Sequence, residues 1–237
     1  MPVYNEQDRI APSLLKINNW LKKNPRKYEI IIVDDGSVDQ TIYTIKTLNK
    51  KIKLNIKIYK KKHEGQFAAI SFGIKKSLSK FPVVIEADLS ASPYYIDILY
   101  KHVPQFDIVS GSRFLKKSKI LHKPFYRDLI SNFFIFLYKI MFKSKVSDPQ
   151  FSFKIYNKKL FLKYSKNLVS KLDGMKSTEI MLKFETNNKK IKEIPIKYIF
   201  YESERNVRKS TAIFLIFNCF LSLFTIWLEL RKKTIKP

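Results

Sequence analysis

The sequence predicts an α/β protein built on a mostly parallel sheet with helices on both faces. Short apolar runs such as YEIIIVDD (28–35) and FPVVIEAD (81–88) alternate with longer segments of helical periodicity. Strands that form continuous apolar runs and are joined by helices are typical of a parallel sheet buried on both sides. The sequence has no internal repeat and no disordered linker, so we expect one main domain over 1–203 and a C-terminal segment over 204–237.

The elements of the first half follow from their patterns. Ile10, Leu14, Ile17 and Leu21 recur at helical spacing and predict an amphipathic helix within 6–23. The apolar run that begins at 28 predicts a buried strand that ends at two aspartates. From periodicity and apolar content, further helices are expected within 41–50, 65–80 and 92–103, and further strands within 54–62, 81–90 and 106–114.

Polar side chains follow three of the expected strands. Asp34 and Asp35 end one strand, Glu86 and Asp88 end another, and Arg113 follows a third. The carboxyl ends of parallel strands form the edge at which open α/β sheets bind ligands. Two carboxylates two residues apart can both reach a hard cation such as Mg²⁺ or Mn²⁺, which brings phosphate groups with it. A metal–phosphate site is therefore one interpretation, and turn and helix-cap residues are the other.

The excess of positive charge favours some classes of binding partner over others. The chain has 46 Lys and Arg against 20 Asp and Glu, a net charge of +26, which favours nucleic acid, acidic lipid or phosphorylated substrates. A nucleic-acid-binding protein is the remote alternative, because the aromatic residues concentrate in apolar runs instead of alternating with lysines. Cys219 is the single cysteine, which excludes a disulfide framework and favours a reducing compartment.

Several motifs in this sequence occur in a recognisable order. PVYNE (2–6), IIVDDGSVDQT (31–41) and IEADLSASP (85–93) resemble the motifs of the type-A fold glycosyltransferases of family 2, which use nucleotide-activated sugars. The later segments SGSRF, SDPQFSFKIYN, EIPIKY and ERNVRKS resemble the subgroup that glycosylates polyprenyl or dolichyl phosphate. DPQFSFK is similar to the D-x-Q-x-G-F-K pattern of dolichyl-phosphate glucosyltransferases. It favours UDP-glucose as the donor, with GDP-mannose as the alternative.

The resemblance implies roles for individual residues at the donor end. Asp88 would bind the Mg²⁺ or Mn²⁺ ion that bridges the donor diphosphate, with help from Glu86 and Ser90. The residues that would border or contact the nucleotide are Pro2, Tyr4, Glu6, Asp34, Asp35, Gly65 and Gln66. The implied catalytic set is Asp88, Arg113, Arg127 and Lys209, in which the three cations face phosphate groups.

The resemblance also implies an acceptor side. It would consist of Asp148, Gln150, Lys154, Glu179 and Arg205. Simpler interpretations stand beside some of these assignments. Arg127 could merely flank a helix, Lys209 could be a solvated lysine, and Glu179 could be a surface partner of Lys183 four residues along a helix. The implied partners are a nucleotide-sugar donor, polyprenyl phosphate and a membrane, with no nucleic acid expected; the sequence does not predict the oligomeric state.

The implied reaction needs little proton chemistry. A phosphate acceptor is already anionic near neutral pH, since its second pKa is about 6. It can attack the anomeric carbon without a dedicated base, and a single displacement inverts that carbon. The same fold with a saccharide or protein acceptor is the alternative, but it would require a general base, and no carboxylate stands out for that role. Glycosidase chemistry by a carboxylate pair is discounted, because adjacent pairs at strand ends suit a cation better.

Two segments predict membrane association, at the cytoplasmic face. Residues 211–228 carry no charge and would extend about 27 Å as a helix, near the hydrocarbon thickness of about 30 Å. Asn218, Ser222 and Thr225 form a polar stripe on it, so a spanning helix and an interfacial helix are both open. Residues 127–143 predict a second amphipathic helix, which is interpreted as interfacial beside the lipid acceptor, with a core helix as the alternative.

The sequence also departs from the family pattern. It begins at Met1-Pro2, so the strand that usually precedes PVYNE is expected to be missing from the sheet. Glu86 stands where the metal motif has its first aspartate. Other unusual residues are His63 in place of asparagine, Phe67 in place of a small residue, and Ser152 and Arg208 in place of glycine. Bulk at glycine positions can block close backbone approach, so a degenerate and inactive copy is a further alternative.

Overall fold

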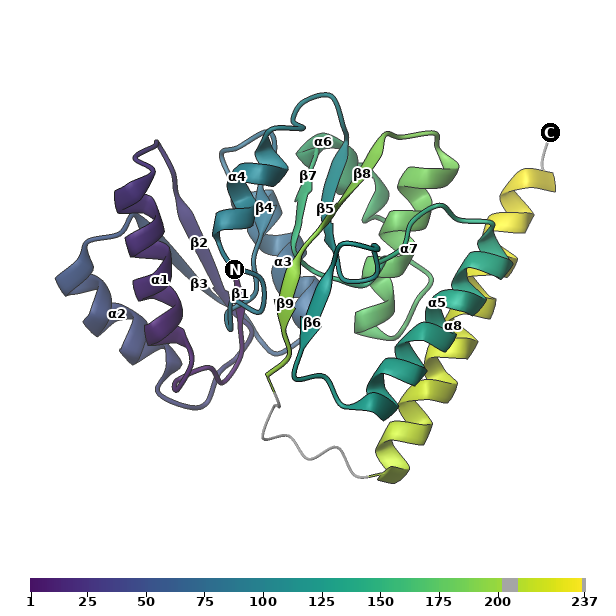
Figure 1. Cartoon of the computed structure of the whole chain (residues 1–237), viewed down its shortest axis with the longest axis horizontal. Coiled ribbons are helices and arrows are strands. Elements are labelled where there is room, and N and C mark those ends of the chain that lie inside the picture. The colour runs from purple at the N-terminus through teal and green to yellow at the C-terminus, as the bar shows by residue number, and fades with distance from the viewer. Residues whose placement is uncertain (202–208, 236–237) are drawn as a thin grey trace.

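The computed structural model describes the backbone over residues 1–201 and 209–235 and the side chains over 1–201 and 216–232 (Figure 1). Every helix and strand expected in the first half is present. In order these are α1 (Ile10–Lys23), β2 (Ile30–Asp34), α2 (Thr41–Ile52), β3 (Ile56–Lys60), α3 (Gln66–Lys76), β4 (Val83–Val84), α4 (Tyr94–Tyr100) and β5 (Ile108–Ser112), and they are preceded by a short strand that was not predicted, β1 (Pro2–Val3). Strand β4 is much shorter than its apolar run, because the chain turns at Glu86.

The second half of the chain adds more helices than strands. Its elements are β6 (Lys119–Leu121), α5 (Phe125–Phe142), β7 (Lys154–Tyr156), α6 (Lys158–Tyr164), α7 (Asp173–Thr186), β8 (Ile191–Pro195), β9 (Lys197–Ile199) and α8 (Lys209–Ile235). The Asn157 side chain accepts a hydrogen bond from the backbone N–H of Leu160 and so caps α6. Periodicity in the sequence located α5 to within two residues.

The strands form three ladders. Strands β1, β2 and β3 pair in parallel, and so do β6 and β9. The central ladder has the order β4-β7-β5-β8, in which β5 and β8 are parallel and β7 is antiparallel to both of its neighbours. The prediction of a mostly parallel sheet is therefore confirmed, with β7 as the exception within the described residues.

Helices cover both faces of these ladders, as predicted. One apolar cluster joins the sheet to α1, α2 and α4, and a second joins it to α3, α6 and α7. Side chains of adjacent strand residues point to opposite faces. Accordingly Ile108 of β5 belongs to the second cluster and Val109 to the first, and both are fully buried.

The first strand of the sheet is short, and a cavity lies beside it. The cavity has a volume of about 510 Å³ and is lined by Ile30 and Ile31 of β2, by Val83 and Val84 of β4, and by Met1. No strand of the described residues joins β4 to the β1-β2-β3 ladder. The amino group of Met1 donates a hydrogen bond to the carbonyl of Ile31, and burial lowers its pKa to about 5.

The C-terminal helix packs on the main domain. Leu223 and Ile226 of α8 are buried in the second cluster, and Phe220 contacts Phe133 of α5 edge to face. Figure 1 shows α5 and α8 side by side along one edge of the molecule. Among the described residues, none of the helices combines the length and the apolar character that a membrane crossing requires.

Candidate functional site

Glu86 and Asp88 lie in a tight turn directly after β4. The backbone N–H of Leu89 bonds to the carbonyl of Glu86, and the N–H of buried Ser90 bonds to Asp88 Oδ1 at 2.9 Å. The hydroxyl of Ser152 donates to Glu86 Oε1 at 3.0 Å. Two of the departures from the family pattern, Glu86 and Ser152, are therefore hydrogen-bonded to each other.

The two carboxylates fit a divalent cation. Burial, and after it the negative charge of Asp88, raise the pKa of Glu86 to about 7. A cation near both groups would relieve this repulsion, and oxygen ligands are those that Mg²⁺ and Mn²⁺ prefer. No cluster of three or more His, Cys, Asp or Glu side chains suited to a metal occurs in the described part of the chain.

Asp34 and Asp35 are both buried and accept hydrogen bonds from the loops after β2 and β3. Asp34 Oδ1 accepts the backbone N–H of Ser37 at 2.9 Å, which forms the turn after β2. Asp35 accepts the backbone N–H groups of Glu64 and Gly65 at 3.0 and 2.9 Å, and its Oδ2 lies 2.8 Å from His63 Nδ1. The structure thus places both aspartates at the carboxyl end of β2, with their carboxylates bonded to loop N–H groups.

An aromatic pair adjoins this loop. The rings of Tyr4 and His63 stack at a centroid distance of 4.2 Å and an angle of 20°. Pro2 precedes them in β1, Glu6 forms an ion pair with Arg9 at 2.7 Å, and Gln66 begins α3. Flat aromatic faces next to buried aspartates are suited to a nucleotide base, which is bound by stacking and hydrogen bonding. Phe67, by contrast, points into the core and packs against Phe161.

Gly65 is held where only glycine fits. Its φ of +104° is strained for any other residue, and a Cβ at this position would lie 2.6 Å from the carboxyl carbon of Asp173. We expect Gly65→Ala to lose about 1–3 kcal/mol of stability and to weaken UDP or GDP binding by displacing the 63–65 loop. Thermal unfolding and calorimetric titration would measure both effects. Gly174→Ala is the matched control, since a Cβ at that position meets nothing within 4 Å.

Arg113, which was predicted to be catalytic, and Asp148, which was predicted on the acceptor side, form an ion pair. Asp148 is fully buried, and its carboxylate accepts Nε and Nη2 of Arg113 at 2.8 and 2.9 Å and the backbone N–H of Arg113 at 3.0 Å. The guanidinium lies over the rings of Phe151 and Tyr198, 4.9 and 5.4 Å from their centroids. The charge of Asp148 raises the pKa of Arg113, so this cation is permanent.

Lys154 and Gln150 were also predicted on the acceptor side. Lys154 is fully buried on β7, and its ammonium donates to the carbonyls of Pro149 and Phe151. Burial lowers the pKa of Lys154 to about 8. Gln150 Nε2 donates to the sulfur of Met175 at 3.4 Å. Both residues thus have protein partners.

The other predicted residues fall in different places. Glu179 accepts the backbone N–H groups of Val169 and Ser170 and pairs with Lys183 at 3.3 Å, so the alternative i,i+4 partner is present, although the pair is buried. Arg127 lies in the first turn of α5, over the ring of Phe200. Arg205, like Arg208, falls outside the described residues, and of Lys209 only the backbone is described, at the start of α8.

A pocket connects Arg113 to the beginning of α5. It has a volume of about 450 Å³ and is lined by Arg113, Phe114, Ser118, Ile120, Lys123, Phe125, Asp128 and Asn132. Lys123 is largely buried there and pairs with Asp128 at 2.9 Å. The sequence analysis missed Lys123 because nothing in the one-dimensional pattern distinguishes it from the other lysines. It also missed Glu193, whose carboxylate accepts the backbone N–H groups of Ser147 and Asp148.

Curated proteins of known activity align with part of this chain. The dolichol-phosphate mannosyltransferase of Pyrococcus furiosus is 35% identical over 132 residues, which are 55% of this chain and 37% of that protein. The poly-beta-1,6-N-acetyl-D-glucosamine synthase of Staphylococcus aureus is also 35% identical, over 127 residues that are 51% of this chain and 29% of that protein. The chain thus spans about a third of the length of these relatives.

Solved structures and a family model cover more of the chain. Glucosyl-3-phosphoglycerate synthase from Mycobacterium tuberculosis, in complex with Mn²⁺, UDP and phosphoglyceric acid, superposes with a TM-score of 0.69 at 11% identity, covering 95% of this chain and 76% of that one. At that identity the likeness shows the fold alone. The model of the family described as Glycosyl transferase family 2 matches residues 1–165. The chain therefore belongs to glycosyltransferase family 2.

Proposed function

We propose that this enzyme transfers a sugar from a nucleoside-diphosphate sugar to polyprenyl or dolichyl phosphate, with inversion at the anomeric carbon. UDP-glucose is the favoured donor and GDP-mannose the second choice. The observation that carries the proposal is the pocket that runs from Arg113 to the first turn of α5. It combines two cations that are partly shielded from water, Arg113 and Lys123, with the ring of Phe125, which is 83% exposed. A phosphate group carried on a long apolar chain would match both parts of the pocket.

The charges of the pocket support a phosphate acceptor. Arg113 and Lys123 are both partly shielded from water, where their attraction for an anion exceeds that of a surface lysine. Asp148 engages Nε and Nη2 of Arg113, which leaves Nη1 for a further anion. Lys123 is paired only with the half-exposed Asp128 among the described residues, so an incoming phosphate competes for it with a solvated carboxylate.

The reaction then follows from placement. An acceptor phosphate oxygen attacks the anomeric carbon, the bond from that carbon to the diphosphate oxygen breaks, and the nucleoside diphosphate leaves with the electron pair. No proton is transferred, so no general base is needed. Bound Mg²⁺ or Mn²⁺, held by Asp88 and Glu86, would supply charge stabilisation for the departing diphosphate. Arg113 and Lys123 hold the nucleophile and exclude water, which accounts for most of what such a site must do.

A panel of nucleotide-activated sugars, each offered as a possible donor, tests this proposal directly. Membranes carrying the protein are incubated with radiolabelled UDP- and GDP-sugars and polyprenyl phosphate, with Mn²⁺ or Mg²⁺. Label in the organic extract that depends on the metal identifies the activity and the donor. Label transferred only to a saccharide or protein would overturn the lipid acceptor, and an absence of transfer despite UDP or GDP binding would favour the inactive copy.

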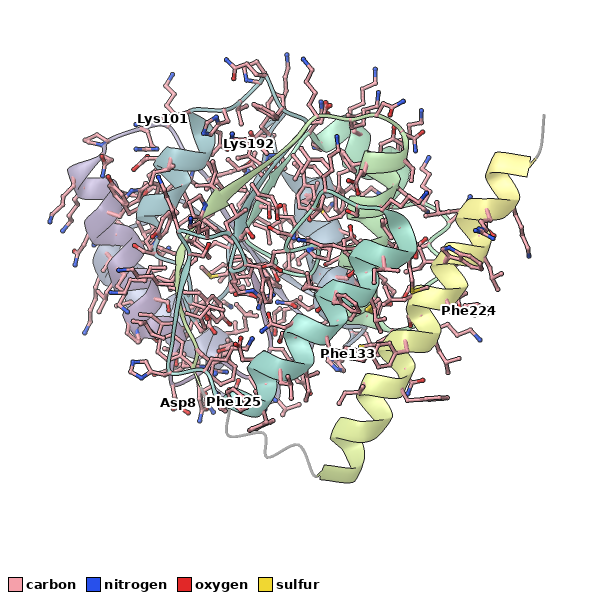
Figure 2. All side chains as sticks on the ribbon, turned by 45° about the vertical axis from the view of Figure 1, so that its right-hand side comes forward. Asp8, Lys101, Phe125, Phe133, Lys192 and Phe224 are labelled. Carbon is pink, nitrogen blue, oxygen red and sulfur yellow. The ribbon has the colours of Figure 1, made fainter. Side chains whose placement is uncertain are left out.

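We further propose that α5 and α8 bind the cytoplasmic face of a membrane. The helices expose Phe125, Leu129, Phe133, Phe136 and Ile140 on α5 and Phe217, Leu221, Phe224 and Leu228 on α8, each at 40% or more of its surface. Figure 2 is turned toward these helices and labels Phe125, Phe133 and Phe224 along them. So large an exposed apolar face is unusual for a protein surrounded by water, and the net charge of +26 favours acidic lipid.

Replacing Phe133 or Phe224 by glutamate should weaken binding to vesicles of phosphatidylcholine and phosphatidylglycerol. Each phenylalanine contributes about 1.5–3 kcal/mol when buried in an apolar phase, so we expect at least a tenfold loss of vesicle affinity, measured by co-sedimentation. Tyr43→Glu is the control, since Tyr43 is 67% exposed on α2, at the opposite edge of the molecule. Equal losses in all three variants would contradict a specific docking face.

The raised pKa of Glu86 makes metal affinity depend on pH. The ionised carboxylate binds the cation, so a proton competes with the metal whenever the pH falls below the pKa of about 7. Between about pH 7.5 and about pH 6, we expect Mn²⁺ affinity in the presence of a nucleotide sugar to fall about eightfold, the loss of ionised Glu86 over that range. Titration of the Mn²⁺ electron paramagnetic resonance signal would measure it. In Glu86→Gln this dependence should disappear, and a persisting slope would assign it to another group.

A further inference from the structure

The segment that carries Asp148 is held from two sides by glutamates. At its start, Glu185 of α7 accepts the hydroxyl of Ser144 at 2.5 Å and the backbone N–H of Lys145 at 2.8 Å. At its end, Glu193 of β8 accepts the N–H and the hydroxyl of Ser147 at 2.7 and 2.8 Å and the N–H of Asp148 at 2.8 Å. We call residues 144–148 the acceptor segment.

The bonds to Glu193 continue directly into the site. The carboxylate of Asp148, whose N–H is held by Glu193, accepts three hydrogen bonds from Arg113. The hydroxyl of Ser147 also lies 2.8 Å from that of Ser112, the residue before Arg113. Glu193 faces Ser110 in the ladder of β5 and β8, so its backbone belongs to the sheet that carries Arg113. Glu185 contacts the acceptor segment as well, but not the residues next to Asp148.

We propose that Glu193 is a positioning residue, which sets the direction of the Arg113 guanidinium and thereby the affinity for the acceptor phosphate. A carboxylate has only acceptor oxygens and can satisfy three donors together. Without it, the N–H groups of Ser147 and Asp148 lose their common acceptor, and the Asp148 carboxylate is free to turn. Because Asp148 engages Arg113 through Nε and Nη2, a turn of Asp148 moves the guanidinium of Arg113, a residue that lines the pocket.

The amide of Glu193→Gln tests this. The substitution replaces one of the two carboxylate oxygens of Glu193 by an NH₂ group, which cannot accept a hydrogen bond from the donors that surround it. We expect KM for polyprenyl phosphate to rise about tenfold to a hundredfold, with little change in kcat or in UDP binding. Glu185→Gln is the matched control and should leave KM unchanged, since it loosens the acceptor segment only at Ser144 and Lys145. Equal KM changes in both variants, or none in Glu193→Gln, would overturn the proposal.

The kinetic part rests on the proposed lipid-phosphate transfer, so a second readout is independent of it. The Nε–H resonance of Arg113 in nitrogen-15 spectra reports its bond to Asp148. It should be protected from exchange in the wild-type protein and in Glu185→Gln, and lost in Glu193→Gln. If the wild type transfers no sugar to polyprenyl phosphate, the proposed function fails, while this resonance still decides the role of Glu193. Should Glu193→Gln not fold, Ser147→Ala removes one of the three bonds and should shift the same resonance; an unchanged resonance would overturn the proposal.

Discussion

Replacing Asp88 by alanine should reduce sugar transfer about a hundredfold to a thousandfold, which is what the loss of one electrostatic group costs in comparable sites. Asp88 and Glu86 are the only two carboxylates in the turn after β4, and Ser90 fixes Asp88 through its backbone N–H. Without Asp88, a divalent cation would keep only Glu86 of this pair of carboxylates. The assay is transfer of label from the donor identified by the panel.

A matched aspartate separates this effect from a general loss of folding. Asp97 of α4 is also partly buried and has two partners, Arg26 at 2.6 Å and the indole of Trp20 at 2.9 Å. Asp97→Ala should therefore cost stability but leave metal-dependent transfer close to the wild-type value per folded molecule. Transfer by Asp88→Ala within tenfold of wild type would remove Asp88 from the metal site.

The second large effect concerns stability. Asp148→Asn should destabilise the protein by about 3–5 kcal/mol, the usual result of removing one partner from a buried ion pair. Asp148 is fully buried, and Arg113 would retain its charge without a compensating carboxylate. The new NH₂ group would also face the donors of Arg113 at 2.8 and 2.9 Å. Thermal unfolding should show a fall in Tm of about 10 °C.

The ion pair of Asp128 with Lys123 is the control. Its distance of 2.9 Å is similar, but the Asp128 side chain is 46% exposed. Asp128→Asn should therefore cost less than about 1 kcal/mol. If both substitutions change Tm equally, burial of the Asp148 pair is not what makes it important for stability.

The elements of the first half and their order were predictable because each depends on local periodicity. The spacing of Ile10, Leu14, Ile17 and Leu21 places one face of α1 in the core, and all four side chains are buried. The position of Glu86 and Asp88 after a buried strand also follows from the apolar run before them. These features need no knowledge of which strands pair.

Other features depend on pairing across the chain and were not predictable. Glu193 meets Asp148 only because β8 pairs with β5, and Asp35 meets Gly65 only because the loops after β2 and β3 converge. The sequence allowed Glu179 to be a site residue or a surface residue. In the structure its side chain is buried and accepts a hydrogen bond from the backbone N–H of Val169, in the loop before α7. The serine at position 152, where the family pattern has glycine, is likewise explained only by the hydrogen bond that its hydroxyl donates to Glu86.

The cavity between β2 and β4 has a consequence for folding. Backbone hydrogen bonds normally make a sheet unfold as one cooperative unit, but in the described part of the chain no ladder crosses from the β1-β2-β3 strands to β4. The two parts are held together by side-chain packing of α1, α2 and α4 on one face and of α3 on the other, and by the contacts of Trp20 and Arg26 with Asp97. We therefore expect the donor end to be a separate foldon, able to open while the part of the sheet that holds Arg113 and Asp148 stays closed. Nucleotide binding would then act partly as the ligand that keeps the weaker foldon folded.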